Sequence, residues 1–479
     1  MALWLVLCPL LLAGVLFAIQ SNRWRPWLLP VGGLIHLVLT VQACSAPTGA
    51  VASANRWLVL DPLGKVFLGQ LSLLFFLCSL YAPAYLAQRK ERSNRVLSAC
   101  MLLSLSMMTL VILSHHLGLM WVAMEATTLC TAPSLYFNHN ARSLEATWKY
   151  LIICSVGIAL ALWGSFFLAY ASLYAGLETT LLFEGLVREA PELSIPWLRA
   201  AFVLLFVGYG TKMGLAPMHT WKPDAYGEAP GLFGALLAGG LTNCAFLAIL
   251  RFYQISVAAD DAAFCQRIMV FMGLFSMGFA AISMPRQRDI KRLLAYSSVE
   301  HMGMLVFGIG IGGAATLGAL WHVIHNGLTK GVLFLAAGNI HRAYGSKFTE
   351  NLKGVVHRLP FSGWMFLFGF LAITGSPPFS PFVSEFQILS ATFSSGRYWV
   401  GGLFLLMMLT VFIGMGATVI SVSLGKSSEP ETPTGFQDSL GTSLPILLFM
   451  GLTLLLGVYN PKGLNDLLHE AVDFLNTQH

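Results

Sequence analysis

Long apolar segments recur along this chain of 479 residues from one end to the other. Hydrophobic residues make up 56% of the sequence and charged residues only 10%, whereas ordinary soluble domains are about one quarter charged. So few charged side chains could not cover the surface of a soluble globule of this length. A helix needs about 20 mostly apolar residues to cross the hydrocarbon core of a bilayer. The sequence therefore predicts an all-α polytopic membrane protein.

About fourteen segments meet this length requirement. They lie near residues 3–20, 27–44, 66–87, 95–113, 116–137, 146–173, 198–218, 229–252, 267–284, 291–312, 314–340, 361–395, 399–424 and 441–459. The first segment has no basic residue before its apolar run, which favours a permanent span over a cleaved signal peptide. A short amphipathic tail follows the last segment and closes the chain.

Basic residues gather in alternate connections between these segments. They follow the first, third, fifth, ninth and eleventh segments, at Arg23 and Arg25, residues 88–95, Arg142, residues 286–292 and residues 342–358. All of these connections lie on one side of the membrane, which the positive-inside rule makes the cytoplasmic side. Both termini are then expected outside. Arg251 and Arg267 are exceptions, because this topology places them on the outer side.

Titratable residues interrupt several of the apolar segments. A charged side chain at the centre of a membrane costs about 2.5–3.5 kcal/mol on insertion scales, so such a residue suggests a function. The candidates for proton translocation are Glu125, Lys149, Lys212, Glu300, His301, His322, His325, Lys330 and Glu385. The alternative is a set of separate structural ion pairs between helices. The order in which these residues follow one another along the chain favours translocation. A helix that only anchors the chain could use leucine without this energetic cost.

The same order of features occurs twice along the chain. Segments five to seven present a carboxylate, a lysine and then a helix broken by Pro217, and segments ten to twelve present Glu300, Lys330 and then a helix broken at residues 377–381. Two copies five spans apart have opposite orientations in the membrane, which is typical of inverted-topology repeats with discontinuous helices. We therefore expect the division 1–94, 95–252, 267–424 and 441–479, with the second and third parts as the repeats.

Lys212 ends the seventh segment, just before the predicted break at Pro217. Proline removes a backbone donor and clashes with the preceding turn, and broken backbone is tolerated at membrane depth only where protein or a watery cavity covers it. Lys212 is therefore expected to face hydrated protein interior, where it could gain and lose a proton. His219, just beyond the break, is a candidate proton shuttle. The alternative for His219 is a role in breaking or capping the helix.

Three motifs resemble a known family. The stretch "GTKMGLAPMHTWKPDAYGEAP" (210–230) resembles the seventh-span signature of the antiporter-like, proton-translocating subunits of respiratory complex I. "RDIKRLLAYSSVEHMG" (288–303) is similar to the matching tenth-span motif, and "TGSPPFSPFVSEFQIL" (374–389) to the broken twelfth helix. Within this superfamily the likeness is closest to energy-converting hydrogenases of the formate hydrogenlyase type, at their component F.

The resemblance implies a fold of about fourteen helices with two inverted five-helix repeats and broken helices seven and twelve. It implies a multi-pass subunit of the bacterial or archaeal cytoplasmic (inner) membrane that moves protons, with sodium ions as the alternative, while a peripheral arm transfers electrons. In the family picture Glu125 and Lys212 form a switchable ion pair. Lys330 matches the lysine of span eleven and Glu385 the terminal acid of span twelve, toward which the proton passes.

Several positions depart from the family pattern. Asn243 stands in span eight where the family usually has a lysine or histidine, and an asparagine cannot hold a transferable proton. The usual Asn-His pair of span eleven reads His325-Asn326, so His322, one turn earlier, is an alternative titrating group. Lys222 stands where the family normally has leucine. If protons pass Asn243, water must carry them.

The chain itself is expected to hold no cofactor or metal and to catalyse no redox step. Its eight cysteines form no C-x-x-C, and a nucleotide-binding G-x-G-x-x-G after a strand is absent. Iron–sulfur clusters, and a nickel–iron centre or quinone, are expected only in partner subunits of the oxidoreductase complex. No long basic run suggests nucleic acid.

Three other functions remain open at this point. The chain could be a subunit of a multisubunit Na⁺/H⁺ antiporter, which shares this ancestry. It could be a scaffold that has lost conduction, since Asn243 interrupts the usual titratable groups. It could also be the proton-coupled partner of an inorganic-carbon uptake system, in which a carbonic-anhydrase-like protein replaces the redox arm.

Overall fold

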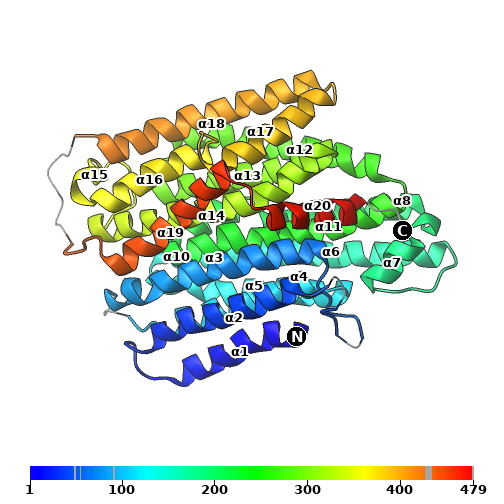
Figure 1. The fold of residues 1–479 in the computed structure, drawn as a ribbon, viewed down its shortest axis with the longest axis horizontal. Coiled ribbons are helices and arrows are strands. Elements are labelled where there is room, and N and C mark those ends of the chain that lie inside the picture. The colour runs from blue at the N-terminus through cyan, green and yellow to red at the C-terminus, as the bar shows by residue number, and fades with distance from the viewer. Residues whose placement is uncertain (48–49, 54, 90–91, 427–433, 477–479) are drawn as a thin grey trace.

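The computed structural model describes residues 1–47, 50–53, 55–89, 92–426 and 434–476. These residues form helices joined by turns, with isolated β-bridges such as that between Leu58 and Ser114. Figure 1 shows most of the long helices side by side along the longest axis of the molecule, with α1 at one edge of the bundle and α18 at the other. The prediction of an all-α architecture is confirmed.

The helices of the first part of the chain are α1 (Ala2–Ala18), α2 (Leu28–Ser45), α3 (Pro62–Ala87), α4 (Arg95–Leu113), α5 (Leu117–Leu135), α6 (Ala141–Tyr174), α7 (Phe183–Glu189), α8 (Ile195–Met213), α9 (Trp221–Glu228), α10 (Gly231–Leu236) and α11 (Thr242–Ala258). Those of the second part are α12 (Ala262–Ser283), α13 (Ile290–Ile311), α14 (Ala314–Tyr344), α15 (Val355–Arg358), α16 (Pro360–Ile373), α17 (Ser380–Ser394), α18 (Tyr398–Leu424), α19 (Leu440–Val458) and α20 (Lys462–Asn476). One π-helical turn, Leu237–Leu241, joins α10 to α11.

Nine helices within the described residues are long and apolar enough to cross a membrane. They are α2 with its preceding turn, α3, α4, α6, α10 together with α11, α12, α13, α18 and α19. Helices α1 and α16 are apolar but shorter, and α5, α8 and α14 carry the polar residues of the predicted translocation path. The membrane-spanning character is thus confirmed, while the number of fourteen spans stays a prediction.

Both predicted helix breaks are present. Helix α8 ends at Gly214, whose φ of 81° is left-handed, and α9 begins only at Trp221. The second break separates α16 from α17 and contains Pro377 and Pro378. Local capping elsewhere follows the usual rules, as at α3, where the Asp61 carboxylate accepts a 2.7 Å hydrogen bond from the Gly64 backbone N–H.

The two halves of the chain pack in the same pairwise order. Helix α4 packs on α5 and α6 on α8 in the first half, and α12 packs on α13 and α14 on α16 and α17 in the second. The amphipathic helix α20 buries Leu468, Ala471 and Leu475 and lies against α3. The predicted tail is therefore an integral part of the bundle (Figure 1).

Glycines allow α6 and α8 to approach closely. A Cβ atom on Gly208 would lie 2.6 Å from both the Ala161 nitrogen and the Gly157 oxygen. A Cβ on Gly164 would lie 2.9 Å from the Leu205 nitrogen. Small residues at such crossings are typical of membrane helices, which gain their association from close packing rather than from the hydrophobic effect. This contact fixes the position of α8, which carries Lys212.

We predict that Gly208→Ala lowers stability by about 1–3 kcal/mol, because its methyl group would overlap backbone atoms that cannot move independently. Gly402→Ala is the matched control, since Gly402 is exposed on α18 and a Cβ there would meet nothing within 4 Å. Thermal unfolding in detergent measures both. Equal melting temperatures for the two variants would contradict the packing argument.

Candidate functional site

Lys212 lies at the C-terminal end of α8 and is fully buried. Its ammonium donates hydrogen bonds to the Thr128 hydroxyl (2.6 Å) and the Tyr150 hydroxyl (3.0 Å), and it lies 5.0 Å from the centre of the Tyr150 ring. Tyr150 in turn shares a 2.6 Å hydrogen bond with Thr131. The buried lysine is thus surrounded by hydroxyl groups from α5 and α6.

Glu125 is partly buried on α5, three residues before Thr128. Its carboxylate accepts hydrogen bonds from the Ser155 hydroxyl at 2.7 Å and from the Thr128 hydroxyl at 3.4 Å. Because Thr128 also accepts from Lys212, a single hydroxyl joins the two charged groups. The two residues of the expected ion pair are therefore neighbours, with Thr128 between them.

Lys222 is a second fully buried lysine of the first half, and it comes from α9. Its ammonium donates to the Met213 carbonyl at the end of α8 (2.9 Å) and to the Ser298 carbonyl of α13 (3.3 Å). It therefore links the broken helix of the first half to the second half. The sequence marks Lys222 only as a departure from the family pattern.

Lys330 is a fully buried lysine of the second half and lies in the middle of α14. Its ammonium donates to the Ser297 hydroxyl at 2.7 Å and lies 3.5 Å from the Leu294 carbonyl. Glu300 is also buried, on the same helix as Ser297. As with Lys212, the side chain that accepts a hydrogen bond from Lys330 is a neutral hydroxyl.

Three histidines and a serine form a connected group beyond Lys330. Nδ1 of His301 lies 2.9 Å from Nε2 of His322, and Nδ1 of His322 lies 2.9 Å from the Ser384 hydroxyl. Nδ1 of His325 lies 3.1 Å from the same hydroxyl, which itself donates to the Pro381 carbonyl at 3.0 Å. The predicted histidines are thus brought together by α13, α14 and the start of α17.

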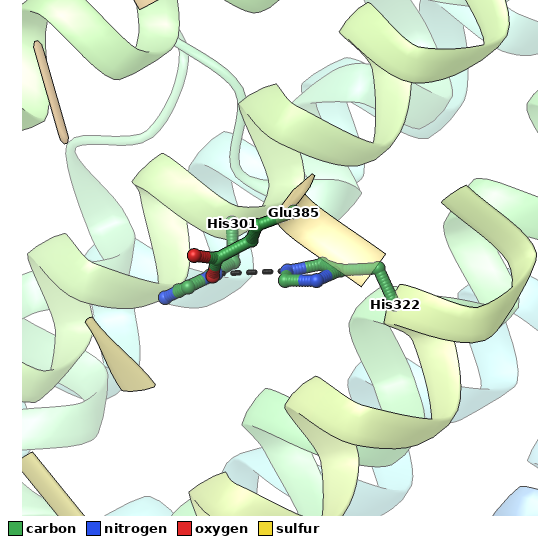
Figure 2. A group of neighbouring side chains, drawn as sticks. All are labelled: His301, His322 and Glu385. Atoms are coloured by element: carbon green, nitrogen blue, oxygen red, sulfur yellow. Dashed lines mark hydrogen bonds and ion pairs between the residues drawn. The ribbon is translucent and has the colours of Figure 1, made fainter. Parts of the chain in front are cut away.

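Glu385 completes this group. Figure 2 shows its carboxylate beside His301, and its Oε1 lies 3.9 Å from Nδ1 of His301. The side chain is buried, and neither oxygen has a hydrogen-bond partner among the described residues. It lies against Gly375 in the second helix break, where a Cβ atom would meet Oε2 of Glu385. The acid therefore sits at the junction of α16 and α17.

His301, His322 and Glu385 are also residue types that bind metal ions. Their ligand atoms lie within 4.8 Å of one another. However, the two histidine nitrogens are only 2.9 Å apart, whereas nitrogen ligands about 2.0–2.1 Å from a tetrahedral zinc are roughly 3.3 Å apart. A separation of 2.9 Å is a hydrogen-bond distance, which requires a shared proton between the rings. The geometry fits a proton relay better than a metal site.

The comparisons with known proteins identify the family. The family model described as "NADH:quinone oxidoreductase/Mrp antiporter, TM" matches residues 114–414. The chain belongs to this family. It is 34% identical over 468 residues to the hydrogenase-4 component F homolog of Methylacidiphilum infernorum, and the match covers 95% of this chain and 96% of the relative. It is 26% identical to a Na⁺/H⁺ antiporter subunit of Bacillus subtilis over 88% of this chain and 82% of the relative.

Chains in solved structures of membrane complexes have the same fold. A chain of the archaeal membrane-bound sulfane sulfur reductase superposes with a TM-score of 0.89 at 21% identity, covering 99% of this chain and 97% of that one. A chain of the Mrp complex from Dietzia sp. gives a TM-score of 0.86 at 19% identity, covering 99% and 97%. These likenesses concern the fold, and they agree with the predicted architecture.

Asn243, the main departure from the family pattern, is the second residue of α11 and lies two residues after the π-helical turn Leu237–Leu241. Its amide nitrogen donates to the Gly239 carbonyl at 2.7 Å and lies 3.3 Å from the Gln70 side-chain oxygen. Gln70 also donates to Gly239, at 2.8 Å. Single π-helical turns occur frequently at functional sites. Here the non-titratable side chains of Asn243 and Gln70 both donate to the Gly239 carbonyl of this turn.

Lys149 does not lie where the sequence predicts. It is near the start of α6, its side chain is 45% exposed, and it pairs with Glu145 at 2.6 Å and with Asp224 at 3.0 Å. The interpretation of Lys149 as a buried intramembrane lysine is wrong, because α6 begins earlier than the apolar segment and places this residue in its third turn. Any role in translocation would be at the end of a path.

The Lys149 side chain lines a cavity of about 580 Å³, and many of the other lining residues are charged. Its lining includes Arg142, Glu145, Asp224, Glu228, Arg286, Arg288, Asp289, Arg292 and Lys347. Lys347 pairs with Glu228 (2.7 Å) and Asp289 (3.1 Å). These residues come from the connections that are predicted to face the cytoplasm, so the cavity is a candidate entrance for protons.

His219 is buried within the first break, between α8 and α9, and packs against aromatic rings. Its ring centre lies 4.3 Å from that of Phe279 and 6.1 Å from that of Tyr296, and its Nδ1 has no hydrogen-bond partner in the described part of the chain. The flanking residues Pro217 and Thr220 are exposed. The structure therefore separates His219 from the hydroxyl groups around Lys212 and favours its alternative role in shaping the break.

A buried ionic cluster that the sequence analysis missed lies at the other end of the bundle. The Asp61 carboxylate contacts the Arg251 guanidinium, and it lies 3.1 Å from Nε2 of His115. Burial alone would raise the pKa of Asp61, but Arg251 and His115 more than offset it and hold that pKa well below its usual range. Burial and the Arg251 charge lower the pKa of His115. Arg251, an exception to the predicted topology, is thus a buried partner of Asp61.

Other residues of the site gave little signal in the sequence. Thr128, Tyr150, Ser297 and Ser384 are neutral, and they are ordinary components of membrane helices. Their importance follows only from the hydrogen bonds that they make to titratable side chains on other helices. For Lys222, the one available signal was its departure from the family pattern, in which leucine is usual at this position.

We predict that Asp61→Asn destabilises the protein by about 3–5 kcal/mol, because it leaves the Arg251 guanidinium buried without a counter-charge. Asp260→Asn is the control, because the Asp260 side chain is exposed. This variant should leave the melting temperature in detergent unchanged. Because the pKa of folded Asp61 is depressed, its stabilising effect is present above its unfolded pKa of about 3.9 and is lost as the pH falls through the folded value. The difference between wild type and Asp61→Asn should therefore shrink below about pH 4. A difference that grows on acidification would refute this assignment.

Proposed function

We propose that this chain translocates protons as a membrane-arm subunit of a hydrogenase-like or complex-I-like assembly. The observation that carries the proposal is the pair of fully buried lysines, Lys212 and Lys330, one in each half of the chain. Each donates to hydroxyl groups of neighbouring helices, with Thr128 and Tyr150 around the first and Ser297 beside the second. These hydroxyl partners are neutral, so they do not fix the charge of either ammonium.

A lysine in such surroundings can exist with and without its proton. Removing a charge from water disfavours the ammonium, while a nearby carboxylate favours it, so the balance depends on where the carboxylate lies. Glu125 is one hydroxyl away from Lys212. A small movement of α5 relative to α8 would change this balance, which is the behaviour that a switchable pair requires.

Several buried polar atoms have no hydrogen-bond partner among the described residues. They include Asn243 Oδ1, both amide atoms of Asn326 and Nε2 of His325. Buried polar groups in proteins are almost always hydrogen-bonded, to protein or to ordered water. A thread of water along these atoms would satisfy them and carry protons between the halves of the chain.

The histidine group supplies the last part of the route. Ser384 donates to the Pro381 carbonyl, so it accepts from Nδ1–H of His322. A neutral imidazole carries one N–H, which makes Nε2 of His322 an acceptor for Nδ1–H of His301. A proton taken up at Nε2 of His301 converts this ring to an imidazolium, which can then release its Nδ1 proton. Glu385, whose Oε1 lies 3.9 Å from this Nδ1, is the final acceptor in this half.

Electron transfer would take place in other subunits. The relatives include hydrogenase-4 component B of Escherichia coli at 27% identity and a subunit of the F420H2 dehydrogenase of Methanosarcina mazei at 29% identity. The proposed assembly therefore holds iron–sulfur clusters, and a nickel–iron centre or quinone, outside this chain. We further propose the cytoplasmic membrane as its location, with both termini outside and with residues 95–252 and 267–424 as the inverted repeats.

A second candidate is a subunit of a sodium/proton antiporter, which the similarity to the Bacillus subtilis antiporter subunit favours. The same lysines and hydroxyls would then move protons against sodium. Purification of the tagged chain from its own cells distinguishes the two. Co-purification with a metal-containing peripheral arm supports the first function, whereas co-purification with membrane subunits alone supports the second.

We predict that Lys212→Met and Glu125→Gln each abolish proton uptake into inside-out vesicles driven by the electron donor of the complex. Methionine removes the exchangeable proton with little loss of volume, and glutamine keeps an oxygen for Ser155 while it removes the charge. The assembled complex, judged by co-purification, should be retained in both variants. Uptake is measured with a pH-sensitive dye.

Lys65→Met is the matched control for this experiment. Lys65 is also a buried lysine, but it lies at the start of α3 and donates to the Ala46 carbonyl at 2.9 Å, away from the proposed route. Vesicles with this variant should take up protons normally. Normal uptake in Lys212→Met would exclude the proposed function.

A further inference from the structure

We propose that Lys222 is a proton relay between the two halves of the chain, in place of the titratable side chain that is missing at Asn243. This inference rests on the proposed function. It assigns a role to a buried lysine that the translocation route described above does not use.

The contacts of Lys222 place it between the two lysine sites. Its ammonium donates to the carbonyl of Met213, the residue after Lys212, and to the carbonyl of Ser298, the residue after Ser297. Ser297 is the hydroxyl partner of Lys330. One side chain therefore contacts the backbone directly beside both lysine sites, although these sites belong to different halves.

The surroundings of Lys222 do not fix its charge. The titratable groups around it include Lys330 from α14, Cys154 from α6 and Tyr226, whose ring centre lies 5.7 Å from the ammonium. Two histidines, His219 and His301, also interact electrostatically with Lys222. A like charge on Lys330 disfavours a charge on Lys222, so protonation of one favours release from the other. Two buried lysines in this relation can pass a proton between them through intervening water.

The structural alternative is that Lys222 only caps α8. The last carbonyls of a helix need donors, and lysine often supplies one. Two other carbonyls of this helix end already have donors, because Gly214 and Leu215 donate to the Gly210 carbonyl and Trp221 donates to that of Thr211. A cap for the Met213 carbonyl needs only a donor, whereas a relay needs a group that can release its proton.

The break in α8 makes room for this side chain. A Cβ atom on Gly214 would lie 2.6 Å from Cδ of Lys222 and 3.0 Å from its Nζ. By contrast, the amide of Asn243 holds the Gly239 carbonyl and cannot exchange a proton with water at physiological pH. The broken helix thus brings a titratable group to the boundary that Asn243 leaves without one.

The test compares Lys222→Arg and Lys222→Met with wild type in the intact complex, in inside-out vesicles driven by formate, hydrogen or NADH, whichever wild-type vesicles use. Arginine keeps the donor and the charge but does not release its proton, so it preserves a cap and removes a relay. We expect Lys222→Arg to assemble normally and to slow proton uptake on the order of 100-fold. Wild-type uptake in Lys222→Arg would overturn the inference.

A second variant keeps the test decisive if substitutions at this position disturb assembly. The double variant Lys222→Leu, Asn243→Lys moves the lysine to the position where other family members carry a titratable side chain. We expect it to recover at least a tenth of wild-type uptake, whereas Lys222→Leu alone does not. Equal uptake in the single and double variants would count against a relay at Lys222. Loss of uptake in Lys212→Met together with normal uptake in Lys222→Arg would reject this inference alone and leave the proposed function intact.

Discussion

The break in α8 imposes the constraint on which the rest of the site depends. Within a bilayer each unsatisfied backbone group costs several kcal/mol, so a helix that ends at membrane depth needs donors for its last carbonyls. Here the short helix α9 folds back and supplies two of them, the indole of Trp221 to the Thr211 carbonyl and the ammonium of Lys222 to the Met213 carbonyl. The need for donors thus brings a lysine into the protein interior beside Lys212.

Hydroxyl groups make this arrangement usable for proton transfer. A direct ion pair between Lys212 and Glu125 would hold the proton on the lysine and would resist separation in a medium of low dielectric constant. Thr128 lies between them, accepting from the lysine and donating to the carboxylate. The same principle recurs at Lys330, whose partner is the Ser297 hydroxyl. Both lysines are fully buried, yet each has a partner that does not require the charge.

The sequence predicted the fold well because bilayer length and proline position are local signals. The apolar segments, the breaks expected at Pro217 and at residues 377–381, and the burial of Lys212, Lys330 and Glu385 all followed from short stretches of sequence. Partners distant in sequence could not be predicted in this way. Arg251 looks misplaced in the sequence because its partner Asp61 is 190 residues away.

Other features depended on helix ends that hydropathy does not define. Lys149 was assigned to the membrane interior because apolar residues follow it, but α6 starts at Ala141 and places it at a charged cavity.

Glu125 and Glu385, the carboxylates at the two ends of the proposed route, differ in how far they are buried. Glu125 is partly exposed on α5, whereas Glu385 is buried but lies against Gly375, next to the exposed Pro377 and Pro378 of the second break. Each acid therefore lies close to an outer face of the chain, while the lysines lie inside it. A neighbouring subunit that packs against either face would change the electrostatic surroundings of the carboxylate there. Through Thr128 on one side that change would reach Lys212, and through His301 on the other it would reach His322.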